Sequence, residues 1–233
     1  MKSTLKLFGF GTLMAVCGAM SMTAFAGGES HQEALGKTER GFVVHTTESA
    51  PQETVEVLNW CVENFGYVPH VAGIMADSPA LSRSYWQLQL NLQSLGTLTP
   101  AEDNVVQMAI AMENECQYCV AGHTMAGRVF FGSSEDQLTA IRSKGELSES
   151  KLNVLRDFAV AVYESHGRVT NAQLESFYAA GYTRAQALDV VANVSAKIMS
   201  NYTNQIAMTP IDEPLKPLAE GLPFQEDRAP IQN

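Results

Sequence analysis

The sequence predicts an all-helical fold, a compact single-domain bundle of about seven to nine helices between residues 51 and 211. Apolar residues recur three and four positions apart along most of this range, which is the spacing of an amphipathic helix. Several of these segments follow a Ser or Thr with Glu or Gln three residues later, the pattern of a capping box. No segment alternates apolar and polar residues as a strand would. With 233 residues, 45% of them hydrophobic, the chain can bury the core of one domain.

Two helices are expected before the central part of the chain. The first ends at Gly66, and its inward face is expected to consist of Val55, Leu58, Val62 and Phe65. A short turn then opens at Pro69. The second helix begins after Ser78, a typical N-cap, with Pro79 at its first position, and it ends at Gly96. Its apolar stripe consists of Leu81, Tyr85, Leu88, Leu92 and Leu95.

Capping boxes mark the starts of four later helices. The first pairs Thr99 with Glu102 and begins a helix through Val105, Val106, Ala109 and Met112. The others pair Ser134 with Gln137, Thr170 with Gln173, and Thr183 with Gln186. One more helix, before His166-Gly167, carries an apolar face of Leu152, Leu155, Phe158 and Val162.

The two ends of the chain differ from this central domain. In residues 1–26, Lys2 and Lys6 precede an apolar run that ends in Ala24-Phe25-Ala26, as in a cleaved secretory signal. Glycines and hydroxyl residues dilute the run too much for a good membrane anchor. We therefore expect an exported, periplasmic protein without stable membrane insertion after cleavage. Residues 27–50 have the composition of a flexible leader, and residues 212–233 form a Pro-rich tail in which a continuous helix is not expected.

Charge and cysteine content narrow the possible functions. The formal charge of −10 becomes −12 without the two signal lysines, so nucleic acid is not an expected partner. The mature chain keeps Cys61, Cys116 and Cys119, which is not the even set of a disulfide framework. A bridge between the last two would close a very short loop and stabilise the fold by only about 2 kcal/mol. Cys61 is expected to be a small buried apolar residue.

The segment Glu115-Cys116-Gln117-Tyr118-Cys119-Val120-Ala121-Gly122-His123 carries the candidate chemistry. If a helix begins near Cys116, then Cys116, Cys119 and His123 fall at about 0°, 300° and 340° around its axis, on one face. The free amides of a first turn favour a thiolate, and a histidine can move a proton near neutral pH. Glu115 opposes this, because a neighbouring negative charge raises the pKa of a thiol. Tyr118 either lines the site or packs against a neighbouring helix.

Other interpretations of these three residues stay open. Two cysteines and a histidine are good zinc ligands, but no fourth ligand is close in sequence, so we expect no metal. A purely structural disulfide and a chance grouping are the remaining alternatives. The sequence has no glycine-rich phosphate loop, no nucleophile elbow and no His-Glu-x-x-His motif, and no cofactor is expected.

Together with Leu98-Thr99-Pro100-Ala101-Glu102 and the helix after it, the cysteine segment resembles the alkylhydroperoxidase (AhpD-like) and carboxymuconolactone decarboxylase superfamily. The resemblance extends from about Pro51 to Ile211. It implies an AhpD-like all-α fold that forms homo-oligomers through its helices. It also implies reduction of a hydroperoxide or small disulfide: Cys119 becomes a sulfenic acid, Cys116 resolves it into a Cys116–Cys119 disulfide, and His123 relays protons. The thiol reductant is unknown.

One position departs from the family pattern. The hydroperoxidases carry a glutamate twelve residues before the first cysteine, where this chain has Asn104, and an amide cannot exchange a proton in that role. Glu102 would point about 160° away, and its capping box explains it better. Residues expected around the reacting groups are Asn104, Glu102, Glu115 and Tyr118. The main alternative is a non-catalytic oligomeric or binding module of the same fold. Lactone decarboxylation is less favoured, because those enzymes lack the paired cysteines.

Overall fold

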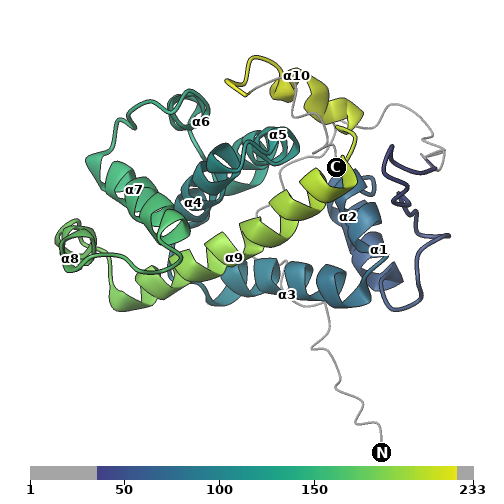
Figure 1. The fold of residues 1–233 in the computed structure, drawn as a ribbon, viewed down its shortest axis with the longest axis horizontal. Helices are drawn as coiled ribbons and strands as arrows, with labels where there is room; N and C mark the ends of the chain where they lie inside the picture. The colour runs from purple at the N-terminus through teal and green to yellow at the C-terminus, as the bar shows by residue number, and fades with distance from the viewer. Residues whose placement is uncertain (1–35, 225–233) are drawn as a thin grey trace, which may run out of the picture.

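The structure, a computed structural model, describes residues 36–224, and within them the predicted all-helical class is confirmed (Figure 1). In chain order the elements are α1 (Val55–Phe65), α2 (His70–Met75), α3 (Pro79–Leu95), α4 (Pro100–Glu113), α5 (Gln117–Ala126), the π-helix η1 (Gly127–Phe131), α6 (Glu135–Arg142), α7 (Ser150–Glu164), α8 (Asn171–Ala179), α9 (Arg184–Ala207), the 3₁₀ helix η2 (Glu213–Leu215) and α10 (Lys216–Ala219).

Nine α-helices, α1 to α9, lie within residues 51–211, in agreement with the expected seven to nine, and α10 follows in the C-terminal segment. Part of the Pro-rich tail folds into η2 and α10, which are only three and four residues long. Pro214 and Pro217 each stand within the first two positions of their helix, where the missing N–H has no helical partner to lose. Proline prevents a continuous helix here but permits two short ones.

All four predicted capping boxes are present, at the starts of α4, α6, α8 and α9. In each, the Ser or Thr side chain accepts a hydrogen bond from the third helical residue, whose own side chain accepts one from the cap. Ser78 also caps α3 as expected. Each such cap stabilises the fold by about 1 kcal/mol. These helix starts follow from interactions within four residues, which is why sequence alone located them.

The predicted inward face of α1 was wrong at Val62. The helix ends at Gly66, whose φ of 81° requires the left-handed region, but Val62 is 41% exposed. The side chains that it buries are Val57, Leu58 and Cys61. Periodicity identifies residues that share a face, whereas the neighbouring α2 and α3 decide which edge of that face is covered.

Helix α4 is the centre of the bundle, since every residue from 102 to 112 is buried. It packs against α5, α7 and α9, and the long α9 crosses the molecule between α3 and α4 (Figure 1). Helix α5 also packs against η2 and α10. The first turn of α5 therefore lies where α4, α9 and the C-terminal segment meet, and this arrangement positions the candidate site.

Residues 1–26, and with them the expected signal, lie outside the described residues, as do residues 27–35 and 225–233. The described part of the expected leader lies against the bundle: Val44 packs with Ile74 and Ala207, and Arg40 donates to the carbonyl of Ile206 at 3.1 Å. Among the helices of residues 36–224, none is both long enough and apolar enough to span a membrane.

Candidate dithiol site

The cysteine segment begins a helix where the sequence predicted. Cys116 is the N-cap of α5, Cys119 lies in its first turn, and His123 follows one turn later. The preceding Glu115 has a φ of 50°, a left-handed conformation that turns the chain sharply between α4 and α5. The described cysteines are free thiols, and Cys116 and Cys119 are only 3% and 4% exposed. The pair is therefore a buried dithiol.

A single amide contacts both sulfurs. Asn204 Nδ2 on α9 lies 3.2 Å from Cys119 Sγ and 3.8 Å from Cys116 Sγ. Burial by itself raises the pKa of Cys119, but the hydrogen bond from Cys116, the charge of Lys197 and the donors of Asn204 and Ser200 together lower it to about 6. Burial and that same hydrogen bond raise the pKa of Cys116 well above its ordinary value. Near neutral pH the pair therefore holds one thiolate, on Cys119, and one thiol.

His123 has a hydrogen-bond partner on each ring nitrogen. Asn104 Nδ2 donates to Ser133 Oγ at 3.1 Å, so the Asn104 carbonyl oxygen faces His123 Nδ1, 2.9 Å away. Nδ1 therefore carries the ring proton, and Nε2 accepts from Lys197 Nζ at 2.9 Å. Burial and the ammonium of Lys197 lower the pKa of His123 well below its usual value. The ring is accordingly a neutral imidazole.

Of the four residues expected around the reacting groups, Asn104 bonds to His123, and the other three have separate surroundings. Asn104 contacts His123 directly, in the place where the resemblance implied a glutamate. Glu102 accepts from the Thr99 amide at 2.9 Å and pairs with Lys151 at 3.3 Å, so it is a cap, as favoured. The Tyr118 hydroxyl donates to Asp212 in the C-terminal segment. Glu115 is half-buried in the turn before α5.

Sequence reasoning missed the contribution of α9. Its buried side chains include five polar ones at helical spacing along one face, Asn193, Lys197, Ser200, Asn201 and Asn204. The signal was present, because a buried helix rarely carries a polar stripe unless that stripe has partners. Nothing local, however, indicated that this stripe faces α5. Among residues 36–224, no group of three or more His, Cys, Asp or Glu side chains is arranged to hold a metal ion.

The C-terminal segment covers α5 through the residues that lie between the two cysteines. Gln117 Nε2 donates to the carbonyl of Ala219 at 3.0 Å, and Tyr118 donates to Asp212. From α6, Arg142 donates to the carbonyls of Leu218 at 2.6 Å and Glu220 at 3.2 Å. These bonds hold η2 and α10 against α5.

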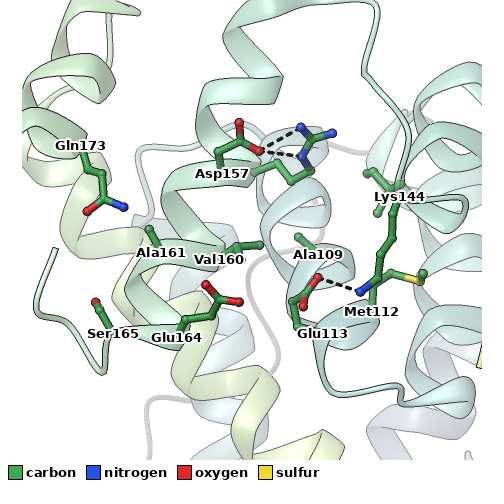
Figure 2. Close-up of a pocket in the computed structure, with 12 residues that line it drawn as sticks. Ala109, Met112, Glu113, Lys144, Asp157, Val160, Ala161, Glu164, Ser165 and Gln173 are labelled. Atoms are coloured by element: carbon green, nitrogen blue, oxygen red, sulfur yellow. Dashed lines mark hydrogen bonds and ion pairs between the residues drawn. The ribbon is translucent and has the colours of Figure 1, made fainter. Parts of the chain in front are cut away.

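A surface hollow lies elsewhere, between α4, α6, α7 and α8 (Figure 2). The pair Lys144–Glu113, with 3.1 Å between Nζ and Oε1, and the pair Arg156–Asp157, at 2.9 Å, lie along it. Neither sulfur nor His123 lines this hollow. Its walls carry none of the groups of the dithiol site, so we assign it no part in that chemistry.

Comparison with known proteins gives matches at the level of structure. No protein-family model matches the sequence, and no curated protein matches it. An uncharacterised peroxidase-related protein with an alkylhydroperoxidase AhpD core, from Ralstonia eutropha JMP134, is similar with a TM-score of 0.64 at 20% identity, over 74% of this chain and 92% of that one. A peroxidase-related protein from Silicibacter sp. TM1040 has a TM-score of 0.64 at 18% identity, over 80% and 97%.

A third solved structure is the debrominase Bmp8 in complex with 2,3,4-tribromopyrrole. It is similar with a TM-score of 0.62 at 15% identity, over 80% of this chain and 96% of that one. Proteins with this architecture therefore differ in activity, and fold by itself does not define the reaction. At these identities the likeness concerns the fold, and the chain has the AhpD-like all-helical fold that its cysteine segment predicted.

Proposed function

We propose that this protein is a thiol-dependent peroxidase or dithiol–disulfide oxidoreductase in which Cys119 attacks and Cys116 resolves. The observation that carries the proposal is the asymmetry of the pair. The hydrogen bond from Cys116 and polar groups from α9 lower the pKa of Cys119 to about 6, whereas the pKa of Cys116 is raised. Because a thiolate is the nucleophile in such chemistry, Cys119 is prepared to attack while Cys116 keeps its proton for the second step.

The reaction has two bond-forming steps. The Cys119 thiolate attacks the terminal oxygen of a hydroperoxide, so that an S–O bond forms, the O–O bond breaks, and an alkoxide leaves and takes a proton. Cys116 then attacks the Cys119 sulfenic acid, an S–S bond forms and water leaves. An external dithiol reduces the disulfide and is itself oxidised. Both sulfurs contact Asn204 Nδ2, so little movement separates the dithiol from the disulfide.

Asn204 also offers an acceptor to the substrate. Its Oδ1 is buried and has no hydrogen-bond partner among the described residues, although its Nδ2 contacts both sulfurs. A buried acceptor without a partner is costly, so such an atom indicates a ligand group. The O–H of a hydroperoxide fits it, because the oxygen of this O–H is the terminal oxygen that Cys119 attacks.

The test is to treat the reduced full chain with one equivalent of tert-butyl hydroperoxide and to locate the modified cysteines by peptide mass spectrometry. We expect a Cys116–Cys119 disulfide and unmodified Cys61. Cys61→Ser serves as the matched control and should react like the native chain, and Cys116→Ser should leave a dimedone-reactive sulfenic acid on Cys119. Oxidation no faster than that of free cysteine, or unchanged in Cys119→Ser, would favour the non-catalytic module.

We also propose that the protein is exported to the periplasm and forms a homo-oligomer. The charge and apolar pattern of residues 1–26 supports export, and the mass of the protein recovered from a periplasmic fraction tests it, with Gly27 expected as the first residue. The resemblance supports an oligomer formed through helix packing. Light scattering of the purified protein tests this, and a monomeric mass would contradict it.

A further inference from the structure

Lys197 is the one basic side chain that is fully buried among residues 36–224, with 1% of its surface exposed. No described carboxylate lies within ion-pair distance of its Nζ. Its hydrogen-bond partner is the neutral ring of His123, 2.9 Å away. Removing an ammonium from water is costly unless an anion compensates it. The fold therefore keeps a buried cation whose counter-ion is not an acidic residue.

The position of Lys197 on α9 indicates where that anion lies. Lys197, Ser200 and Asn204 are three and four residues apart, so their side chains share one face of the helix. Asn204 contacts Cys119 Sγ at 3.2 Å, and the charge of Lys197 also acts on this thiol. Cys119 is thus the anion-forming group beside the buried ammonium.

The other charged or titratable groups around Cys119 leave this assignment unchanged. On α5 they are Cys116, which keeps its proton, and His123, which is neutral. From α4 the facing side chain is the uncharged Asn104, which bonds to His123. From the C-terminal segment, Asp212 accepts a hydrogen bond from the Tyr118 hydroxyl, and its Oδ1 lies 3.2 Å from His70 Nε2, so it has partners of its own.

His123 cannot take the place of Lys197. Its Nδ1 proton is held by Asn104, and its Nε2 lone pair is occupied by the Lys197 ammonium. A second positive charge next to that ammonium is disfavoured. The transferable proton of this hydrogen-bonded pair is therefore on Nζ, and the imidazole fixes the direction in which the ammonium points.

We propose that Lys197 is a further catalytic residue of the proposed reaction: its ammonium is the counter-ion of the Cys119 thiolate, and the Lys197–His123 pair supplies the proton that the departing oxygen takes. The peroxide step rests on the proposed function. The counter-ion role is a property of the reduced protein and is tested without peroxide. In this chain a lysine and an asparagine together replace a relay based on a carboxylate.

The protons balance. The Cys119 thiolate, the Lys197 ammonium and a hydroperoxide give the Cys119 sulfenic acid, an alcohol and the Lys197 amine. The amine takes the proton of Cys116 as this sulfur attacks, and returns it to the hydroxide that leaves Cys119 as water. An external dithiol then reduces the disulfide, and its two protons restore the Cys116 thiol and the Lys197 ammonium.

The experiment measures the rate of Cys119 alkylation by iodoacetamide against pH, read by peptide mass spectrometry, in the native chain, Lys197→Met and Lys197→Arg. We expect a midpoint near pH 6 in the native chain. In Lys197→Met the midpoint should rise by about one unit or more, so that the rate at pH 6 falls about fivefold or more, because the rate follows the thiolate fraction. Lys197→Arg should keep most of the native rate. An unchanged midpoint in a folded Lys197→Met overturns the proposal.

A second measurement keeps the proposal testable if Lys197→Met does not fold. In the native chain, ¹⁵N shifts of the His123 ring should report the Nδ1–H tautomer and a neutral imidazole from pH 5 to pH 8, while Cys119 titrates. A ring that protonates in this range while Cys119 stays a thiol contradicts the assignment. If peroxide leaves the native thiols intact but Lys197→Met still shifts the midpoint, the counter-ion role stands and the proposed peroxidase function fails.

Discussion

Cys61 and Cys119 are both buried in helices of the same bundle, yet their thiols differ in character. Cys61 on α1 packs beside Val57 and Leu58 and is 0% exposed. Burial alone raises its pKa far above the ordinary range. Cys119 is 4% exposed, but the hydrogen bond from Cys116, the charge of Lys197 and the donors of Asn204 and Ser200 overcome the effect of burial and lower its pKa. Burial makes a thiol inert, and only specific polar partners convert the same burial into reactivity.

The two thiols differ because the helices around them have different buried faces. The buried face of α1 is apolar, whereas the buried face of α9 carries amides, a hydroxyl and an ammonium. Facing α9, α4 adds the buried Asp103 and Gln107, which both bond to Asn193. These buried polar side chains between α4 and α9 are tolerated because they bond to one another, as Gln107 does to Asn193 at 2.7 Å.

The largest effect should come from removing the amide of Asn204. We expect Asn204→Leu to make the surroundings of Cys119 resemble those of Cys61, raising its pKa and slowing its alkylation at pH 6.5 by about fourfold to fortyfold, since a hydrogen bond to a charged group contributes about 1.5–3 kcal/mol. Thr203→Val, on the same helix, is the matched control and should keep the native rate. Stopped-flow alkylation measures both. Equal alkylation rates in the native and Asn204→Leu chains would contradict a role for Asn204 in lowering the pKa of Cys119.

A smaller effect concerns the pH dependence of the free energy of unfolding, through Asp103 on α4. Asp103 accepts from Asn193 Nδ2 at 2.7 Å, and burial, opposed by this bond but aided by Asp189 and Glu102, raises its pKa to about 7. The folded form therefore binds this proton more tightly than the unfolded chain. The contribution of Asp103 to the free energy of unfolding is fully present below pH 4 and is lost as pH rises through about 7.

Asp103→Asn keeps the shape and removes the titration. We expect the variant to match the native protein at pH 4 and to exceed its free energy of unfolding by about 2–4 kcal/mol at pH 8. Glu175→Gln, at an exposed position, is the control and should change stability by less than about 0.5 kcal/mol at either pH. Urea unfolding at the two pH values measures the difference. A variant less stable than native at pH 8 contradicts the assignment.

The smallest effect concerns access to the sulfurs. Arg142 holds the C-terminal segment by hydrogen bonds to the carbonyls of Leu218 and Glu220. We expect Arg142→Leu to loosen this cover and to raise the plateau rate of Cys119 alkylation several-fold, without moving its pH midpoint. Arg168→Leu is the control, because Arg168 is exposed and distant in sequence from the segment. A shifted midpoint would show that the cover also tunes the thiolate.

The sequence by itself determined the features that depend on neighbours along the chain. The capping boxes at Thr99, Ser134, Thr170 and Thr183 fixed helix starts, because each is closed within four residues. Cys116, Cys119 and His123 likewise lie on one short helix, so their spacing was sufficient to group them.

Only the tertiary structure decided what surrounds that helix. Lys197 meets His123 from 74 residues away, Asn204 meets Cys119 from 85, and Asp212 meets Tyr118 from 94. Such contacts depend on how α9 and the C-terminal segment pack against α5, and helical periodicity does not encode the choice of neighbour. The pKa of a buried thiol is set by these distant partners, so its reactivity followed from the packing of the helices.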